Sequence, residues 1–254
     1  MKVYFLGTGT SQGIPVIGSK HSVCLSTDLK DKRLRVSVWI HTTDFSIIID
    51  CGPDFRQQML TSNCQHVDAI LFTHEHADHT AGLDDIRPFY FVQGAIPIYA
   101  HQRVIQNLTK RFDYIFETAN KYPGAPSVIP IEVKENQTFK IKNKSIVPIS
   151  ALHGTLQVFG YKIEDFAYLT DVKQIDTAEI EKIKGVKVLV INALRYELHD
   201  THFNIEEAIN FIHLVQPQKA YITHISHLMG FHQEIEQNLP KNVFLAYDNL
   251  EIEV

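Results

Sequence analysis

The chain has 254 residues, of which 44% are hydrophobic and 21% charged, and its formal net charge at pH 7 is -5. This length and composition suit one layered α/β domain that spans residues 1–254. The acidic balance disfavours a nucleic-acid binder that works through bulk electrostatics. The one dense basic run, residues 30–35, is more typical of a solvated loop than of a phosphate-steering patch.

The three cysteines, Cys24, Cys51 and Cys64, are odd in number and widely spaced. Such usage is typical of a reducing compartment, where free or metal-bound thiols prevail over disulfides. The apolar part of the first ten residues is too short for a signal peptide, and no stretch approaches about 18 apolar residues. We therefore expect a cytoplasmic protein that does not interact with membranes.

Strand and helix signals follow one another without a linker, a repeat or a low-complexity segment. Apolar and alternating runs predict strands at residues 2–7, 35–42, 45–52, 69–74, 96–101, 139–152, 156–171, 187–194, 219–225, 242–247 and 250–254. Helices are predicted at residues 53–63, 177–185, 204–216 and 230–239, and at the start of an amphipathic and then aromatic segment, 102–126. Because strands come in runs between helices, we expect two mixed sheets with helices outside, a four-layer αββα sandwich.

Residues 70–83, ILFTHEHADHTAGL, concentrate imidazole and carboxylate side chains directly after an apolar strand. His74, His76, Asp78 and His79 stand within six residues, and alternate side chains in such a turn can serve two ions. This mixture of ligands suits zinc, manganese or iron. Further ligand-type residues appear where later apolar strands end, and these are His153, Asp171 and His224.

The segments THEHADH, LHG, YLTD and THISH together resemble the metallo-β-lactamase fold superfamily of binuclear hydrolases, over nearly the whole chain. The resemblance implies two divalent ions, zinc or manganese, with Asp171 as the bridging ligand. One ion would be held by His74, His76 and His153, and the other by Asp78, His79 and His224. Asp50, which closes IIIDCG, matches the acid that orients a ligand imidazole by hydrogen bonding. The lone histidines His41, His66, His101 and His213 are interpreted as structural or surface residues.

The N-terminal stretch FLGTGTSQGIPVIG resembles one branch of this superfamily. That branch holds the tRNA 3′-processing endonuclease and the phosphoribosyl 1,2-cyclic phosphate phosphodiesterase. HDTHFNIEEA resembles its late histidine motif, which implies that His202 contacts the phosphate and protonates the leaving oxygen, a step worth about 10²–10⁴-fold. His199 is the second candidate for this role. A helix-capping or packing role for His202 is the alternative.

The same phosphodiesterase carries a separate structural zinc on a C-x-C-x-x-C loop and a later histidine. At the matching positions this chain has Ser19, His21, Cys24 and His227. His21, Cys24 and His227 could hold a third metal ion, a structural zinc, with water or Ser19 as the fourth partner. Structural zinc sites normally have four protein ligands, so a loop held by hydrogen bonds alone is an equal alternative.

The segment between His79 and His153 is aromatic and only mildly basic, unlike the basic arm that a tRNA-processing enzyme needs. Its residues Lys110 and Arg111 belong either to a lid over a small ligand or to a helix that covers the sheet. Arg87 could reach a substrate phosphate, or form an ion pair with Asp84 or Asp85.

The expected function is therefore hydrolysis of a small cyclic phosphodiester such as phosphoribosyl 1,2-cyclic phosphate. In this hypothesis metal-activated hydroxide attacks phosphorus, and Asp78, Asp171 and His202 are the catalytic residues. Nucleic acid is not the expected partner, and a homodimer agrees with the resemblance. The alternatives are a thioester or lactone hydrolase of the glyoxalase II type, a tRNA 3′-processing-like nuclease, and a metal- or nucleotide-binding protein without turnover.

Overall fold

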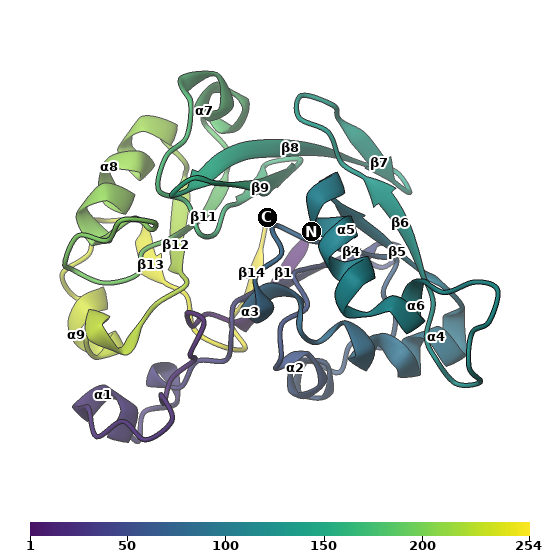
Figure 1. The fold of residues 1–254 in the computed structure, drawn as a ribbon. Helices are drawn as coiled ribbons and strands as arrows, with labels where there is room; N and C mark the ends of the chain where they lie inside the picture. The colour runs from purple at the N-terminus through teal and green to yellow at the C-terminus, as the bar shows by residue number, and fades with distance from the viewer.

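Two seven-stranded β-sheets lie face to face in the computed structural model, which describes residues 1–254 (Figure 1). The first sheet has the strand order β14-β1-β2-β3-β4-β5-β6. Its strands are β14 (Glu251–Glu253), β1 (Lys2–Gly7), β2 (Ser37–His41), β3 (Ser46–Ile49), β4 (Ala69–Leu71), β5 (Ile96–Ala100) and β6 (Val128–Glu132).

The second sheet has the order β13-β12-β11-β10-β9-β8-β7. Its strands are β13 (Val243–Leu245), β12 (Lys219–Thr223), β11 (Val188–Asn192), β10 (Phe166–Tyr168), β9 (Leu156–Ile163), β8 (Lys144–His153) and β7 (Phe139–Ile141). The two termini meet at the edge of the first sheet, where β1 pairs with β14 and the Met1 amine donates to the Val254 carbonyl over 3.1 Å.

Each sheet is half antiparallel and half parallel. In the first sheet β14, β1, β2 and β3 pair antiparallel, and β3, β4, β5 and β6 pair parallel. The second sheet has the same division, antiparallel from β7 to β10 and parallel from β10 to β13. Because parallel strands end at the same edge of a sheet, the polar residues that follow them come together there.

Helices cover the outer face of each sheet (Figure 1). On the first sheet these are α2 (Phe55–Ser62), α4 (Arg87–Gln93), α5 (Gln102–Arg111) and α6 (Asp113–Phe116), and on the second they are α7 (Thr177–Ile183), α8 (Ile205–Val215) and α9 (His232–Glu236). The short elements are α1 (Ser22–Leu25), α3 (Ala77–Thr80) and the 3-10 turns η1 (Leu29–Asp31), η2 (Leu83–Ile86) and η3 (His227–Met229). None of the helices has the length and apolar character that a bilayer crossing requires.

Three apolar clusters separate these four layers. Between the sheets, Phe5 and Val38 of the first share one buried cluster with Phe159 and Tyr161 of the second. A second cluster joins the outer face of the first sheet to α2 and α5, and a third joins the second sheet to α7 and α8. The expected αββα sandwich is thus confirmed.

Two elements of the first sheet's half were not predicted. Strand β6 contains Pro130 and has no buried residue, so its sequence lacks the alternation that marks a half-buried strand. Helix α4 is short and has no fully buried residue, although Phe89 packs against the outer core of the first sheet. Both elements lie at the margin of the fold, where few side chains are buried and the sequence therefore has no clear hydrophobic period.

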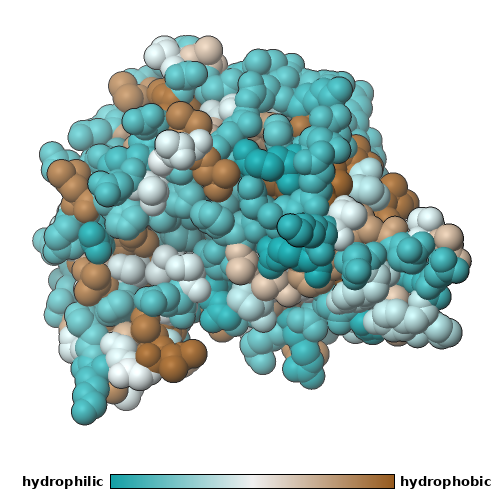
Figure 2. Space-filling view, in the orientation of Figure 1, coloured by the Kyte–Doolittle hydropathy of each residue, from teal (hydrophilic) through white to brown (hydrophobic).

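An N-terminal arm, residues 13–32, projects from the body and carries α1 (Figure 1). In Figure 2 brown atoms gather on this projection at the lower left, and its side chains Ile17 and Leu25 are exposed. The arm is anchored at its base by a buried polar network. There Arg33 donates to the Thr8 hydroxyl over 2.7 Å and lies 3.1 Å from His232 Nδ1, and burial lowers the pKa of this arginine to about 10.

Candidate metal centre

The carboxyl ends of strands from both sheets supply one polar cluster. Asp50 follows β3, the 74–80 loop follows β4, Asp171 follows β10 and His224 follows β12. Asp50, Asp171 and His224 all have positive φ, at 66°, 58° and 56°. A positive φ is energetically unfavourable for residues other than glycine, and it is enriched at functional sites. The backbone is therefore bent where these side chains must turn toward one point.

The seven expected metal ligands all lie in this cluster, in overlapping groups of three. Within each group the ligand atoms lie within 4.8 Å of one another. The groups are His74, His76 and His153; Asp78, His79 and His224; and His74, His79 and Asp171. The third group joins the first two, because it takes His74 from the first and His79 from the second. A fourth group, His153, Asp171 and His202, also links Asp171 to the first, and Asp171 lies 3.3 Å from the Nε2 atoms of His79 and His224 in the second. The expected ligand residues are thus brought together around Asp171, and their assignment to two ions stays a prediction.

Asp50 holds the ring of His79 from behind. Its Oδ2 lies 2.6 Å from His79 Nδ1, and it accepts hydrogen bonds from the Thr73 amide and hydroxyl, each over 2.8 Å. All of these atoms are buried. A proton on Nδ1 that faces Asp50 leaves Nε2 as the free lone pair, and it is directed toward Asp78 and Asp171.

Other imidazoles are oriented in the same way. His153 Nδ1 donates to the Thr201 carbonyl over 2.7 Å, which again leaves Nε2 for a ligand. The Nε2 atoms of His74, His79 and His224 are buried and have no hydrogen-bond partner. Buried polar atoms are rarely left unsatisfied, so these orphaned nitrogens converge on a missing partner.

The charges of the cluster also favour a bound cation. Burial lowers the pKa of His74 well below its ordinary value, which keeps that ring neutral and able to coordinate. Burial disfavours charge on His79 too, yet the carboxylates of Asp171, Asp50 and Asp78 raise its pKa well above the ordinary value. Carboxylates this deeply buried need positive charge beside them. The neutral imidazole of His74, the buried carboxylates and the ring nitrogens without hydrogen-bond partners together fit divalent metal ions.

His202 lies against the shared carboxylate, as expected for a residue of the site. Its Nε2 is 3.0 Å from Asp171 Oδ1, and its Nδ1 is 3.2 Å from His199 Nδ1. Helix α8 is capped instead by Asn204, whose side chain accepts from the Glu207 amide in a capping box. His202 is therefore not the helix cap.

Two arginines of α5 form hydrogen bonds with the 74–80 loop. Arg103 binds both carboxylate oxygens of Glu75, over 2.8 and 3.0 Å, and Arg111 donates to the Glu75 carbonyl over 3.0 Å. Arg111 also donates to the Thr80 hydroxyl over 2.9 Å, and that hydroxyl donates to the His76 carbonyl over 2.8 Å. Sequence reasoning missed Thr73, Thr80 and Arg103. The position of both threonines within or beside the ligand motif was the available signal.

The structure also answers two expectations for the segment between His79 and His153. Helix α5 packs on the first sheet through Val104, Ile105 and Leu108, so it covers the sheet rather than forming a separate lid. Arg87 lies 2.5 Å from Asp84 and also donates to the Gly124 carbonyl, so its guanidinium is engaged in an ion pair.

The arm residues proposed to hold a structural zinc do not form a ligand group. His21, Cys24 and His227 belong to none of the groups whose ligand atoms converge. His21 Nδ1 instead accepts from the Val23 amide over 3.3 Å and caps α1, while Cys24 Sγ accepts from the Val16 amide. These local backbone hydrogen bonds engage His21 and Cys24, whereas the buried Nδ1 of His227 has no hydrogen-bond partner. The structure thus does not bring the three residues together, and a third metal ion stays a prediction. All three cysteines of the chain are free and buried.

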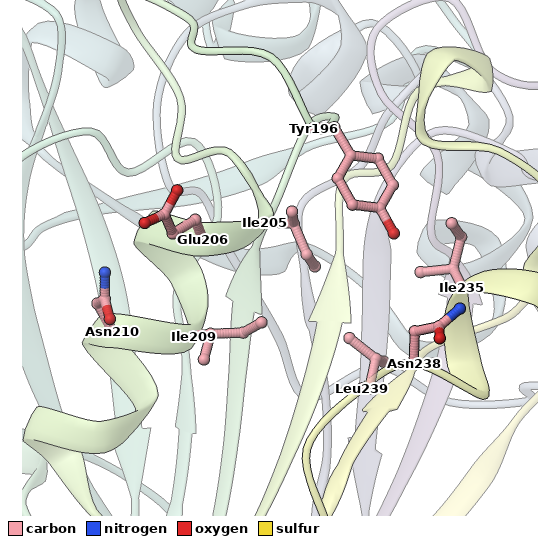
Figure 3. A pocket seen from close by; sticks show the side chains of 8 residues that line it. All are labelled: Tyr196, Ile205, Glu206, Ile209, Asn210, Ile235, Asn238 and Leu239. Atoms are coloured by element: carbon pink, nitrogen blue, oxygen red, sulfur yellow. The ribbon is translucent and has the colours of Figure 1, made fainter.

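A groove of about 380 Å³ lies apart from the metal centre, on the outer face of the second sheet. Figure 3 shows side chains of α8 facing those of α9, with Tyr196 above them. Its lining residues are Tyr196, Ile205, Glu206, Ile209, Asn210, Ile235, Asn238 and Leu239, none of which is a candidate ligand.

Comparison with known proteins agrees with this geometry. Residues 46–225 match the family described as the beta-lactamase superfamily domain. An octanoyltransferase of Porphyromonas gingivalis is 41% identical over 253 residues, which is 99% of this chain and 51% of that protein. Ribonuclease Z of Bacillus licheniformis is 30% identical over 173 residues, 65% of this chain and 49% of that protein. The chain thus spans about half the length of these relatives.

Among solved structures, a diphosphatase from the PhnP family superposes with a TM-score of 0.92 and 35% identity, covering 100% of this chain and 97% of the other. The short form of human tRNase Z gives a TM-score of 0.70 at 19% identity, covering 100% and 99%, which supports the fold alone. The family match, the near-complete superposition and the converging ligand residues agree. The chain belongs to the beta-lactamase superfamily and has the metallo-β-lactamase fold.

Proposed function

We propose that this chain is a binuclear metal-dependent phosphodiesterase that acts on a small phosphate ester. The observation that carries this proposal is the pair of ligand triads joined by Asp171, with His202 against the same carboxylate. The likeness to the PhnP-family diphosphatase supports a substrate with phosphorus at the reacting centre. Phosphoribosyl 1,2-cyclic phosphate and other small cyclic phosphodiesters are the proposed substrates.

In this proposal His74, His76 and His153 would hold one ion, Asp78, His79 and His224 would hold the other, and Asp171 would serve both. When bound, two divalent ions, zinc or manganese, would supply Lewis-acid activation of water and neutralise charge at phosphorus. The role of Asp50 is to fix the proton of His79 on Nδ1 and thereby keep Nε2 available.

His202 is the proposed proton donor to the leaving oxygen. Its Nε2 edge points into the cluster at Asp171, and its Nδ1 is held by the Thr201 hydroxyl at 3.0 Å and by His199. A donor fixed on both ring nitrogens loses little freedom when it acts. His199, which contacts only the far nitrogen of His202, is a positioning residue rather than the donor.

The test uses the purified chain loaded in turn with zinc and with manganese. Hydrolysis of bis(p-nitrophenyl) phosphate and of cyclic phosphodiesters is measured for the wild type and for Asp78→Ala. We expect turnover in the wild type, its loss on chelation, and no measurable turnover in the variant. Activity that survives in Asp78→Ala would end the proposal.

A second candidate is hydrolysis of an acyl thioester, because polarised carbonyls also suit such a site. The observation in its favour is the 41% identity to a relative named octanoyltransferase. That relative is about twice as long, so the half outside the match can account for its name. An octanoyl thioester belongs in the substrate panel, and turnover of the thioester with inert phosphodiesters would decide for this candidate.

A further inference from the structure

We infer that Arg111 is a specificity-determining residue that binds a second anionic group of the substrate, one that is not the reacting phosphate. This inference rests on the proposed phosphodiesterase function and names the class of its substrate, a phosphodiester with an additional phosphate. Arg111 is the last residue of α5 and is exposed at the rim of the metal centre.

The two arginines of α5 differ in how their charge is used. Arg103 is neutralised, because it forms a two-pronged ion pair with the Glu75 carboxylate and also donates to the Gln157 carbonyl over 2.6 Å. Arg111 donates only to neutral oxygens, the Glu75 carbonyl and the Thr80 hydroxyl, lies 5.4 Å from the centroid of the Phe112 ring, and has no carboxylate within 4.0 Å. Both of its contacts use Nη1. Its Nε and Nη2 donors are therefore free for an anion.

The position of Arg111 is tied to the metal ligands. The Thr80 hydroxyl that accepts its hydrogen bond donates in turn to the carbonyl of His76, a candidate ligand. The guanidinium is thus held beside the 74–80 loop and does not swing freely in solvent. A planar guanidinium fixed in this way matches the geometry of a phosphate.

The rim also gives the direction in which the second group lies. The rings of His76 and His153 are 5.3 Å apart, and those of His153 and His202 are 4.5 Å apart. Arg111 contacts the loop that carries His76, whereas the proposed proton donor His202 lies next to His153. A substrate that spans both would place its leaving oxygen at His202 and a second phosphate at Arg111.

Other cations near the rim fit this role less well. Lys173 is engaged by Glu207 at 2.7 Å. Arg195 stands on the His202 side, donates to the Leu198 carbonyl and lies 3.8 Å from a Glu197 oxygen.

The experiment compares two substrates that differ only in the second anion, 5-phosphoribosyl 1,2-cyclic phosphate and ribose 1,2-cyclic phosphate. The quantity measured is the ratio of kcat/KM for the phosphorylated substrate over that for the other. We expect the wild type to prefer the phosphorylated substrate by at least about tenfold, and Arg111→Ala to lower the ratio by about 10- to 100-fold. Arg111→Lys should give an intermediate ratio, because it keeps the charge but loses the planar fork.

Lys110→Ala is the matched control. Lys110 carries the same charge one residue earlier on α5, is exposed, and points about 100° away around the helix. Its removal should leave the ratio unchanged, which separates a local contact from the overall charge of the helix.

Three outcomes would overturn the inference. They are an Arg111→Ala variant that loses activity equally on both substrates, an Arg195→Ala variant that alone collapses the ratio, and a wild type without preference. In each of them the enzyme still cleaves phosphodiesters, so the proposed function stands. A chain inert toward every phosphodiester overturns both proposals.

Discussion

The metal centre and the N-terminal arm present similar residue types in opposite states. In the centre, the imidazoles of His74, His79 and His224 keep buried Nε2 atoms without partners, next to shared carboxylates. In the arm, His21 Nδ1 and Cys24 Sγ accept hydrogen bonds from the backbone amides of Val23 and Val16.

A metal site therefore requires more than the correct residues in the correct order. Its donor atoms must converge, and the protein must withhold other partners from them. The centre achieves this because strand ends from two sheets meet and because Asp50 and Thr201 hold the unused ring nitrogens of His79 and His153. The arm is a single short loop, where neighbouring amides satisfy the same donors locally.

The largest expected effect comes from removing the residue that joins the two triads. Asp171→Ala should lower kcat/KM for bis(p-nitrophenyl) phosphate by about 10³-fold or more, because it removes a ligand from both proposed ion sites and the contact of His202. Steady-state kinetics and metal content of the same preparation measure it. Asp176→Ala, an exposed aspartate five residues later, is the control and should behave as the wild type. An Asp171→Ala enzyme within tenfold of the wild type would contradict the two-ion arrangement.

The next largest effect is expected at Asp50, which orients the ring of His79 without being a metal ligand itself. Asp50→Asn keeps the shape of the side chain but loses the charge that fixes His79 Nδ1–H. Metal affinity should fall by about 10- to 100-fold, as for other residues that orient a ligand imidazole. Competition with a chromophoric chelator measures the affinity. Asp44→Asn, in the turn at the opposite end of β3, should leave it unchanged, and an equal loss in both variants would assign Asp50 a general role in folding.

The same comparison explains what the sequence could predict. The seven ligand residues were accessible because each follows an apolar strand, and a fold with parallel strands brings such ends together. The family resemblance then assigned them to two ions. The fold could be predicted as well, because buried strands and amphipathic helices have periodic patterns of hydrophobic residues.

The contacts that decide between alternatives were not accessible in this way. Whether His21 caps a helix or binds zinc depends on distances of a few ångströms, which spacing along the chain does not fix. Arg111 was placed either in a lid or in a sheet-covering helix, yet its contact with Thr80 joins residues 31 positions apart. Long-range side-chain pairs of this kind require the three-dimensional structure.

A smaller effect tests how the arm is anchored. Asp248 accepts from the Leu34 amide over 2.6 Å and from the Thr8 hydroxyl over 2.7 Å, and burial raises its pKa from 3.8 to about 6. The folded state therefore holds this proton more tightly than the unfolded state. The free-energy cost of the carboxylate is absent below pH 4 and grows as the pH rises through 6.

Relative to Asp248→Asn, the wild type should lose about 2 kcal/mol of unfolding free energy between pH 4.5 and 7.5. Urea unfolding of both proteins, with a chelator present so that metal binding does not contribute, measures the difference. The subtraction cancels the other titrating groups. A difference that is flat with pH, or that rises toward pH 7.5, would show that the hydrogen bonds of Asp248 outweigh its burial.

The smallest expected effect is at His227, which packs against His21 of the arm. His227→Ala should leave two metal ions per chain, as in the wild type, because His227 belongs to no converging group. Its ring packs edge-on against His21 with centroids 5.0 Å apart, a contact worth about 0.5 kcal/mol at a partly exposed position. Metal analysis and thermal unfolding of zinc-saturated protein test both statements. Three zinc ions in the wild type and two in His227→Ala would mean that the arm rearranges to bind metal. Both regions would then be metal sites, and the contrast between converging and non-converging donor atoms would fail.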